Sequence, residues 1–239
     1  MLTFSRLAPI RPALGALAAS MRACVAASLL LVAGWYAAAN PDLAAMEQQL
    51  IARFGPARVT LLRDWARMIA STSLLNDSEK LRRINDFFNQ NISFDDDRAI
   101  WQESDYWATP LETIGRGRGD CEDFAIAKYF SLQLAGVPVH KMRLIYVRAS
   151  TTTPSGAAPQ AHMVLAYYAN PRAEPVLLDN LHATIRPAAQ RRDLQPVFSF
   201  NSEGIYPGIA GTTTASAGPL GRLSRWERLL QRARSEGFH

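Results

Sequence analysis

Apolar residues recur every three to four positions in four stretches of the chain, which is the pattern of amphipathic helices. The stretches cover residues 43–54, 59–70, 76–91 and 121–134. Helix signals stand at their ends: Gly55 follows the first stretch, Asn76 can cap the third, and Asp120 can cap the fourth. The chain between residues 43 and 134 is therefore predicted to be mainly helical.

After residue 140 the apolar period shortens to two, which indicates β-strands. The predicted strands cover residues 142–147, 162–168 and 176–178, with turn residues between them. One helix followed by an antiparallel meander predicts an α+β domain. Because the last two strands would form a hairpin, His162 at the start of one should lie beside Asp179, which follows the other.

The first 39 residues have the composition of an export segment. They contain no acidic residue, and Arg22 precedes an apolar run that ends in three alanines at positions 37–39. These features predict a secretory signal peptide over residues 1–39 with cleavage after Ala39. The alternative is an uncleaved N-terminal anchor, because the run nearly reaches the length that spans a bilayer. Both alternatives place the body of the protein outside the cytoplasm.

The remaining chain divides into three parts by composition. Residues 40–207 carry the predicted helices and strands and form one expected domain. Residues 208–221 are a low-complexity linker with little to bury. Residues 222–239 predict a basic amphipathic helix. That helix either makes peripheral contact with anionic lipid or a partner, or packs back on the domain.

The net charge of +5 does not by itself indicate nucleic-acid binding. Arginines are concentrated before the apolar N-terminal run and in the predicted C-terminal helix, so the domain between them is close to neutral. The sequence also lacks an interleaved stripe of basic and aromatic residues. Nucleic acid is therefore disfavoured as the main partner.

Cys121 is the residue with the most informative context. Cys24 lies in the apolar N-terminal run, so cleavage would leave Cys121 without a disulfide partner in a compartment that favours disulfides. The glycine-rich run 115–119 leads to Asp120, which puts Cys121 at the first position of its helix. There the helix dipole stabilises a thiolate, and the glycines leave room for a substrate backbone. Cys121 is thus either a nucleophile or a small buried apolar residue.

Cysteine protease chemistry requires a thiolate, an imidazole that exchanges its proton, and a third group that orients the imidazole. Cys121, His162 and Asp179 supply these groups in that order. His162 is the histidine expected at a strand edge with an acid on the neighbouring strand. The three residues are therefore the candidate catalytic set.

Carboxylates surround the candidate nucleophile at Asp120, Glu122 and Asp123. Like charges raise the pKa of a thiol, and a bound cation would remove that conflict; oxygen ligands suit Ca²⁺. The alternative is that these acids only complement the helix dipole. A second acidic run, residues 95–97, reads as a solvated turn, with cation binding as the other option.

Several motifs together resemble the bacterial transglutaminase-like cysteine proteases of the LapG type. The motifs are DYWATPLE at 105–112, GDCEDFAIAKYFSL at 119–132, AHMVLAYY at 161–168 and VLLDNL at 176–181. The resemblance implies a papain-like fold of the transglutaminase kind. It also implies Cys121 as nucleophile, His162 as general base and acid, and Asp179 as the group that orients the imidazole.

The same resemblance implies a biological setting. Family members are periplasmic, calcium-dependent proteases that cut large surface adhesins near the N-terminus. An inner-membrane receptor that senses cyclic di-GMP sequesters them and so controls biofilm attachment. The resemblance favours Ca²⁺ at Asp120, Glu122 and Asp123, while the segment beyond residue 208 is not part of the family pattern.

Two other functions fit the same residues. A thioester on Cys121 could be passed to an amine or could arise from a cell-wall amide, which gives an acyl transferase or an amidase. The third alternative is a calcium-responsive binding module without catalysis, in which Cys121 is structural. Reactivity of the thiol separates the last alternative from the first two.

Overall fold

The computed structural model describes residues 42–153, 156–210 and 220–238. The predicted signal segment 1–39 and most of the predicted linker lie outside the described residues. The chain from Pro41 to His239 forms one compact unit, and the C-terminal helix belongs to it. In the described part, no helix has both the length and the apolar character needed to cross a membrane.

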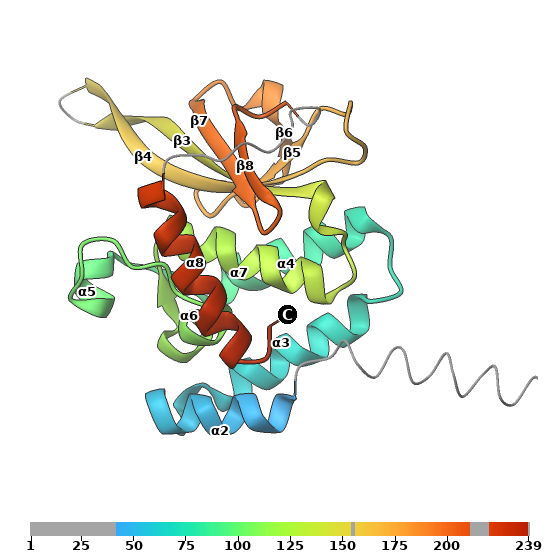
Figure 1. Cartoon of the computed structure of the whole chain (residues 1–239), viewed down its shortest axis with the longest axis vertical. Helices are drawn as coiled ribbons and strands as arrows, with labels where there is room; N and C mark the ends of the chain where they lie inside the picture. The colour runs from blue at the N-terminus through green and yellow to red at the C-terminus, as the bar shows by residue number, and fades with distance from the viewer. Residues whose placement is uncertain (1–41, 154–155, 211–219, 239) are drawn as a thin grey trace, which may run out of the picture. The chain divides into compact units, whose positions relative to one another are not determined.

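Helices make up most of the first half of this unit (Figure 1). They are α2 (Leu43–Phe54), α3 (Val59–Thr72), α4 (Asp77–Asn91), α5 (Asp97–Trp101), α6 (Pro110–Arg116) and α7 (Cys121–Leu134), with 3₁₀ turns η1 (Pro56–Arg58) and η2 (Val139–Lys141). The four predicted helices are confirmed. The sequence pattern missed α5 and α6, which are too short to show a period; Thr109 and Glu112 start α6 with a capping box.

An antiparallel sheet of six strands follows, in the order β6-β5-β4-β3-β7-β8. Its strands are β3 (Met142–Thr153), β4 (Gly156–Tyr167), β5 (Val176–Leu178), β6 (Arg186–Pro187), β7 (Leu194–Asn201) and β8 (Gly204–Pro207), with η3 (Ala188–Gln190) between β6 and β7. The α+β class is thus confirmed. The predicted strand starting at His162 is longer in the structure, so His162 lies inside β4 opposite Val147.

Helix α7 lies between this sheet and the other helices (Figure 1). It is buried on nearly all sides from Asp123 to Leu132, and it packs mainly on β4 and α4. Leu144, Met163 and Leu165 of the sheet join its core. Because α7 is held from both sides, its first residue, Cys121, has a fixed position against β4.

The C-terminal helix α8 (Leu220–Ser235) packs back on the domain (Figure 1). Its apolar residues Trp226, Leu229 and Ala233 are buried in the main core, and the Trp226 ring lies 5.3 Å from that of Phe200. Of the two alternatives for the apolar face, the structure shows packing on the domain. Peripheral membrane contact by the outer, arginine-rich face stays a prediction.

Two short parallel strands place the start of α7 beside the acidic run 95–97. Strand β1 (Ser93–Phe94) pairs with β2 (Arg118–Gly119), and Phe94 faces Gly119 in this register. The Asp95 amide extends the pairing by donating to the Gly119 carbonyl. Because parallel strands end at the same edge, the residues after Phe94 meet the residues after Gly119.

Candidate active site

Cys121 is the first residue of α7, as predicted, and the Asp120 side chain caps the helix by accepting from the amides of Glu122 and Asp123. The thiol is half-buried between α7 and β4. The Met163 amide donates to the sulfur, which favours the thiolate, but other groups dominate. Desolvation and the carboxylates of Glu122 and Asp120 raise the pKa of Cys121 well above its usual value.

The Cys121 thiol is hydrogen-bonded to the next residue in the chain, Glu122. Cys121 Sγ donates to Glu122 Oε2 over 2.7 Å. This contact stabilises the protonated sulfur, because a carboxylate accepts a hydrogen bond from a thiol but repels a thiolate. The conflict expected from the sequence between Cys121 and its acidic neighbours is therefore present in the structure.

The glycines before Cys121 serve the fold rather than a substrate. Gly117 has φ +65° at the end of α6, a conformation that favours glycine. A Cβ at Gly115 would lie 2.3 Å from the Phe54 ring, and one at Gly119 would lie 2.7 Å from Asp123 Cβ. The expectation that these glycines leave room for a substrate backbone is wrong at Gly115 and Gly119, because side chains of the protein itself fill that space.

His162 and Asp179 are neighbours, as the predicted hairpin requires. Leu165 of β4 pairs with Leu178 of β5, and Asp179 follows directly. His162 Nε2 and Asp179 Oδ1 are 2.8 Å apart, and both side chains are almost fully buried. With Nε2 bound to the carboxylate, Nδ1 is the ring nitrogen that remains for proton exchange.

Several groups that the sequence analysis missed hold Asp179. Arg191 Nη1 donates to Oδ2 over 2.7 Å, and the Leu181 amide donates to Oδ1 over 3.0 Å. Lys128 Nζ and Asn89 Nδ2 both donate to its main-chain oxygen. Sequence reasoning had no signal for Asn89, Lys128 and Arg191, because they lie on three different segments, 12 to 90 residues away from Asp179.

Burial alone would raise the pKa of Asp179, but the hydrogen bonds from His162, Leu181 and Arg191 outweigh it and hold the pKa below its usual range. Asp179 is therefore an anion. Lys128 donates to the main-chain oxygen of Asp179, and burial lowers the pKa of Lys128 to about 7. An ionised Asp179 stabilises positive charge on His162, as the third group of a cysteine protease must.

A compact carboxylate cluster lies next to Cys121, formed by Asp97, Asp120 and Asp123. One oxygen from each lies within 4.8 Å of the others. Asp97 is buried at the start of α5, so the expectation of a solvated turn is wrong for this residue. The cause is the β1–β2 pairing, which turns the segment after Phe94 toward the start of α7.

Two oxygens of this cluster are buried without a hydrogen-bond partner among the described residues. The Tyr106 amide binds Asp97 Oδ2 and the Ala108 amide binds Asp123 Oδ1, while Asp97 Oδ1 and Asp123 Oδ2 find no partner in the described part of the chain. Buried polar atoms are rarely left unsatisfied in proteins. A hard cation with oxygen ligands fits this donor set, and Ca²⁺ prefers such ligands.

The raised pKa values of the three carboxyl groups also fit a cation-binding site. Burial, together with the charges of Glu122 and Asp105, raises the pKa of Asp97 to about 6. Burial and the neighbouring carboxylates also raise the pKa of Asp120 and of Asp123. Of the predicted metal ligands, Asp120 and Asp123 belong to this group, whereas Glu122 groups with Asp120 and Cys121.

Comparisons with known proteins agree on one family. Residues 65–192, more than half of the chain, match the family described as bacterial transglutaminase-like cysteine proteinase BTLCP. No curated protein matches the sequence. Among solved structures, LapG of Legionella pneumophila is 35% identical, with a TM-score of 0.65, and the alignment covers 80% of this chain and 96% of that one.

Two further structures of the same Legionella protein also match. The calcium-bound form is 36% identical with a TM-score of 0.65, over 80% of this chain and 98% of that chain. The EGTA-treated form is 34% identical with a TM-score of 0.66, over 80% of this chain and 96% of that chain. This chain therefore has the transglutaminase-like fold, and it belongs to the bacterial transglutaminase-like cysteine proteinases.

Proposed function

We propose that this cysteine protease is a calcium-dependent endopeptidase whose catalytic residues are Cys121, His162 and Asp179. The observation that carries the assignment is the buried hydrogen bond of 2.8 Å between His162 and Asp179. It is formed directly beside Met163, whose amide donates to the Cys121 sulfur. The residue after His162 thus contacts the Cys121 sulfur, which supports our assignment of a nucleophile, a base and an orienting anion to these three residues.

The reaction follows from these positions. His162 takes the thiol proton, and the Cys121 thiolate attacks the carbonyl carbon of the scissile amide. The backbone N–H of Cys121 at the helix start is suited to stabilise the resulting oxyanion. The imidazolium then protonates the leaving amine, and a thioester remains on Cys121. Water, deprotonated by His162, hydrolyses the thioester, while Asp179 stabilises the positive charge on His162 throughout.

Asp97, Asp120 and Asp123 are the residues we propose as calcium ligands. Their carboxylates fit the ion because they are clustered and because two of their buried oxygens have no hydrogen-bond partner within the part of the chain that the structure describes. A bound Ca²⁺ supplies positive charge that offsets the carboxylates around the thiol. The calcium-bound form of Legionella LapG supports this proposal.

The proposed substrate is the N-terminal region of a large surface adhesin, cut in the periplasm. The proposed regulator is an inner-membrane receptor for cyclic di-GMP that sequesters the protease and so controls biofilm attachment. These two proposals rest on the family resemblance of the motifs around Cys121, His162 and Asp179.

The test is cleavage of purified adhesin N-terminal fragments by the full chain, with calcium or with excess chelator. We expect wild-type protein to cut only with calcium, and Cys121→Ala to be inactive while still folded. Cys24→Ala is the matched control and should remain active. Cleavage by Cys121→Ala would refute the catalytic assignment, and full activity in chelator would refute the calcium requirement.

Mass spectrometry of the products separates the alternative thiol chemistries. A clipped polypeptide supports the endopeptidase. A new isopeptide bond to an added amine would instead identify an acyl transferase, and release of a cell-wall fragment would identify an amidase.

A further inference from the structure

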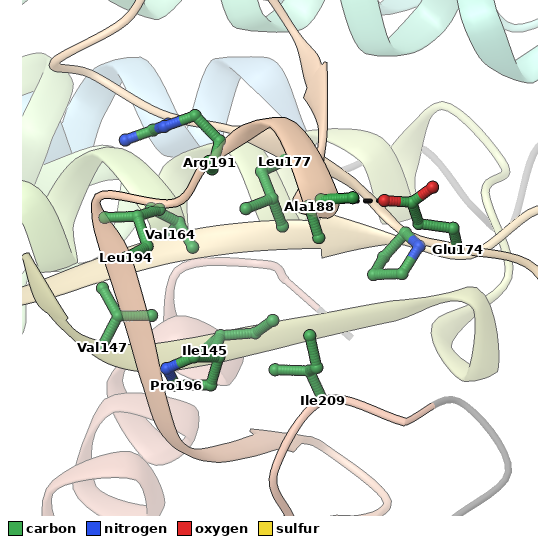
Figure 2. Close-up of a pocket in the computed structure, with 12 residues that line it drawn as sticks. Ile145, Val147, Val164, Glu174, Leu177, Ala188, Arg191, Leu194, Pro196 and Ile209 are labelled. Carbon is green, nitrogen blue, oxygen red and sulfur yellow. Dashed lines mark hydrogen bonds between the residues drawn. The ribbon is translucent and has the colours of Figure 1, made fainter.

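The sheet has a second apolar face, opposite the one that packs on α7. Ile145, Val147 and Val164 alternate along their strands with the residues that join the main core, so they point to this outer side. A cavity of about 320 Å³ opens there. Figure 2 shows Arg191 at its edge, with the guanidinium group directed away from the aliphatic side chains.

The Arg191 guanidinium points to the catalytic acid. Its Nη1 lies 2.7 Å from Asp179 Oδ2, and its Nη2 lies 2.7 Å from Asp193 Oδ2. The Arg191 side chain is only 3% exposed. The buried Arg191 guanidinium thus binds both Asp193 and Asp179, and Asp179 in turn is hydrogen-bonded to His162.

This contact does more than anchor the segment that carries Asp179. The main-chain oxygen of Asp179 is already held by Lys128 and Asn89, and Oδ1 also accepts from the Leu181 amide. Arg191 is the side chain that binds Oδ2. A contact at the second oxygen fixes the rotation of the carboxylate plane, and therefore the direction in which Oδ1 meets the imidazole.

A purely stabilising role explains the pair poorly. Removing two charges from water costs about as much as their attraction returns, so buried ion pairs contribute little net stability. What the pair does achieve is a carboxylate that is ionised and held in one orientation. Those are the two properties that His162 needs from Asp179.

We propose that Arg191 is a positioning residue for proteolysis, which acts by holding the Asp179 carboxylate in the orientation and the ionised state that support His162. The proposal rests on the catalytic assignment made above. Arg191 acts through Asp179 and does not need to contact the substrate.

The experiment measures alkylation of Cys121 by iodoacetamide as a function of pH, in the full chain with calcium, and mass spectrometry resolves the Cys121 peptide from that of Cys24. The variants are Arg191→Met and Arg191→Lys, with Arg192→Met as the matched control. Arg192 is adjacent and exposed, so its loss removes the same charge without touching Asp179.

We expect Arg191→Met to slow alkylation near neutral pH by about 10–100-fold, the range by which activity falls when a metal ligand loses the outer partner that orients it. The acidic side of the curve of alkylation rate against pH (the acid limb) should move to higher pH, because Asp179 is protonated more easily without the Arg191 guanidinium. Arg191→Lys retains the charge, so its acid limb should stay near that of the wild type while its rate is reduced. Arg192→Met should match the wild type.

An unshifted acid limb in a folded Arg191→Met protein would overturn the proposal, even if its melting temperature falls. If Arg191→Met does not fold, Arg191→Lys decides: a rate and profile equal to those of Arg192→Met would overturn it. Asp179→Asn separates the two levels of inference. A wild-type profile for Asp179→Asn would refute the catalytic assignment, whereas a changed profile there with none at Arg191 refutes only the positioning role.

Discussion

The two carboxylate oxygens of Asp123 differ in their hydrogen bonding. Oδ1 accepts from the Ala108 amide over 2.8 Å, while Oδ2 is buried without a hydrogen bond to any described residue. Asp123 is completely buried, so its negative charge is costly unless a positive charge compensates it. Asp123 therefore binds the segment before α6 through one oxygen and belongs to the proposed cation site through the other.

The variant Asp123→Asn should separate these two roles. The amide oxygen can still accept from Ala108, and the buried charge disappears. We expect the calcium-free protein to become more stable by about 1–3 kcal/mol, and the stabilisation by calcium to be lost. Urea unfolding with calcium and with chelator measures both effects.

Asp96→Asn is the control for this variant, since Asp96 is exposed and belongs to the same acidic run. It should behave as the wild type. An undiminished calcium effect in Asp123→Asn would remove this residue from the ligand set.

Asp179 makes the stability of the protein depend on pH in a defined direction. Its pKa lies below the unfolded value, so its contribution is present above about pH 4 and is lost as the pH falls toward the folded pKa. We expect Asp179→Asn to lower the free energy of unfolding at neutral pH by about 3 kcal/mol, because it breaks buried pairs with His162 and Arg191. The difference from the wild type should narrow in acid; urea titrations at neutral and acidic pH measure it, and a constant difference contradicts this account.

At the scale of elements, α8 holds the segment that supports the carboxylate cluster. Arg225 pairs with Asp105 over 3.0 Å, and Arg232 binds the Trp107 carbonyl and lies over the Tyr106 ring. The Tyr106 amide in turn binds Asp97. A helix that lies beyond the family motifs thus contacts the segment that orients a proposed calcium ligand.

Loss of the Arg232 contacts should loosen this segment. We expect Arg232→Met to weaken calcium affinity by about tenfold, because outer partners orient the ligands of a metal site. Isothermal titration calorimetry of the full chain measures the affinity. Arg234→Met, an exposed change in the same helical turn, is the control, and equal affinities for the two variants would show that α8 only contributes packing.

At the scale of the whole molecule, the proposed calcium ligands come from separate parts of the chain. Asp97 belongs to α5, while Asp120 and Asp123 belong to the start of α7. An ion bound to all three joins these elements in the folded state only. Calcium binding should therefore be coupled to global stability.

We expect calcium at about 100 times its dissociation constant to stabilise the full chain by about 2.7 kcal/mol, since it binds the folded state alone. Differential scanning calorimetry should show a rise in melting temperature that chelator reverses. Magnesium should have a smaller effect, because it demands a tighter octahedral shell and gives up its water reluctantly. Equal melting temperatures with calcium and chelator would refute the coupling.

Local features were predicted from the sequence because their physical causes lie within a few residues. Helical periodicity located α2, α3, α4 and α7, and the capping ability of Asp120 placed Cys121 at a helix start. The predicted hairpin placed His162 beside Asp179, because neighbouring antiparallel strands bring these positions together, although His162 lies inside β4 rather than at its start.

What the sequence by itself determined is therefore the helical and strand pattern, the position of Cys121 and the meeting of His162 with Asp179. Only the tertiary structure decided that Asp97 joins the cluster, that Arg191 holds Asp179 and that α8 packs on the domain. These contacts join segments far apart in the chain, through the β1–β2 pairing, the fold of the sheet edge and burial of an apolar helix face. Such contacts leave no local period, since they depend on how whole elements pack.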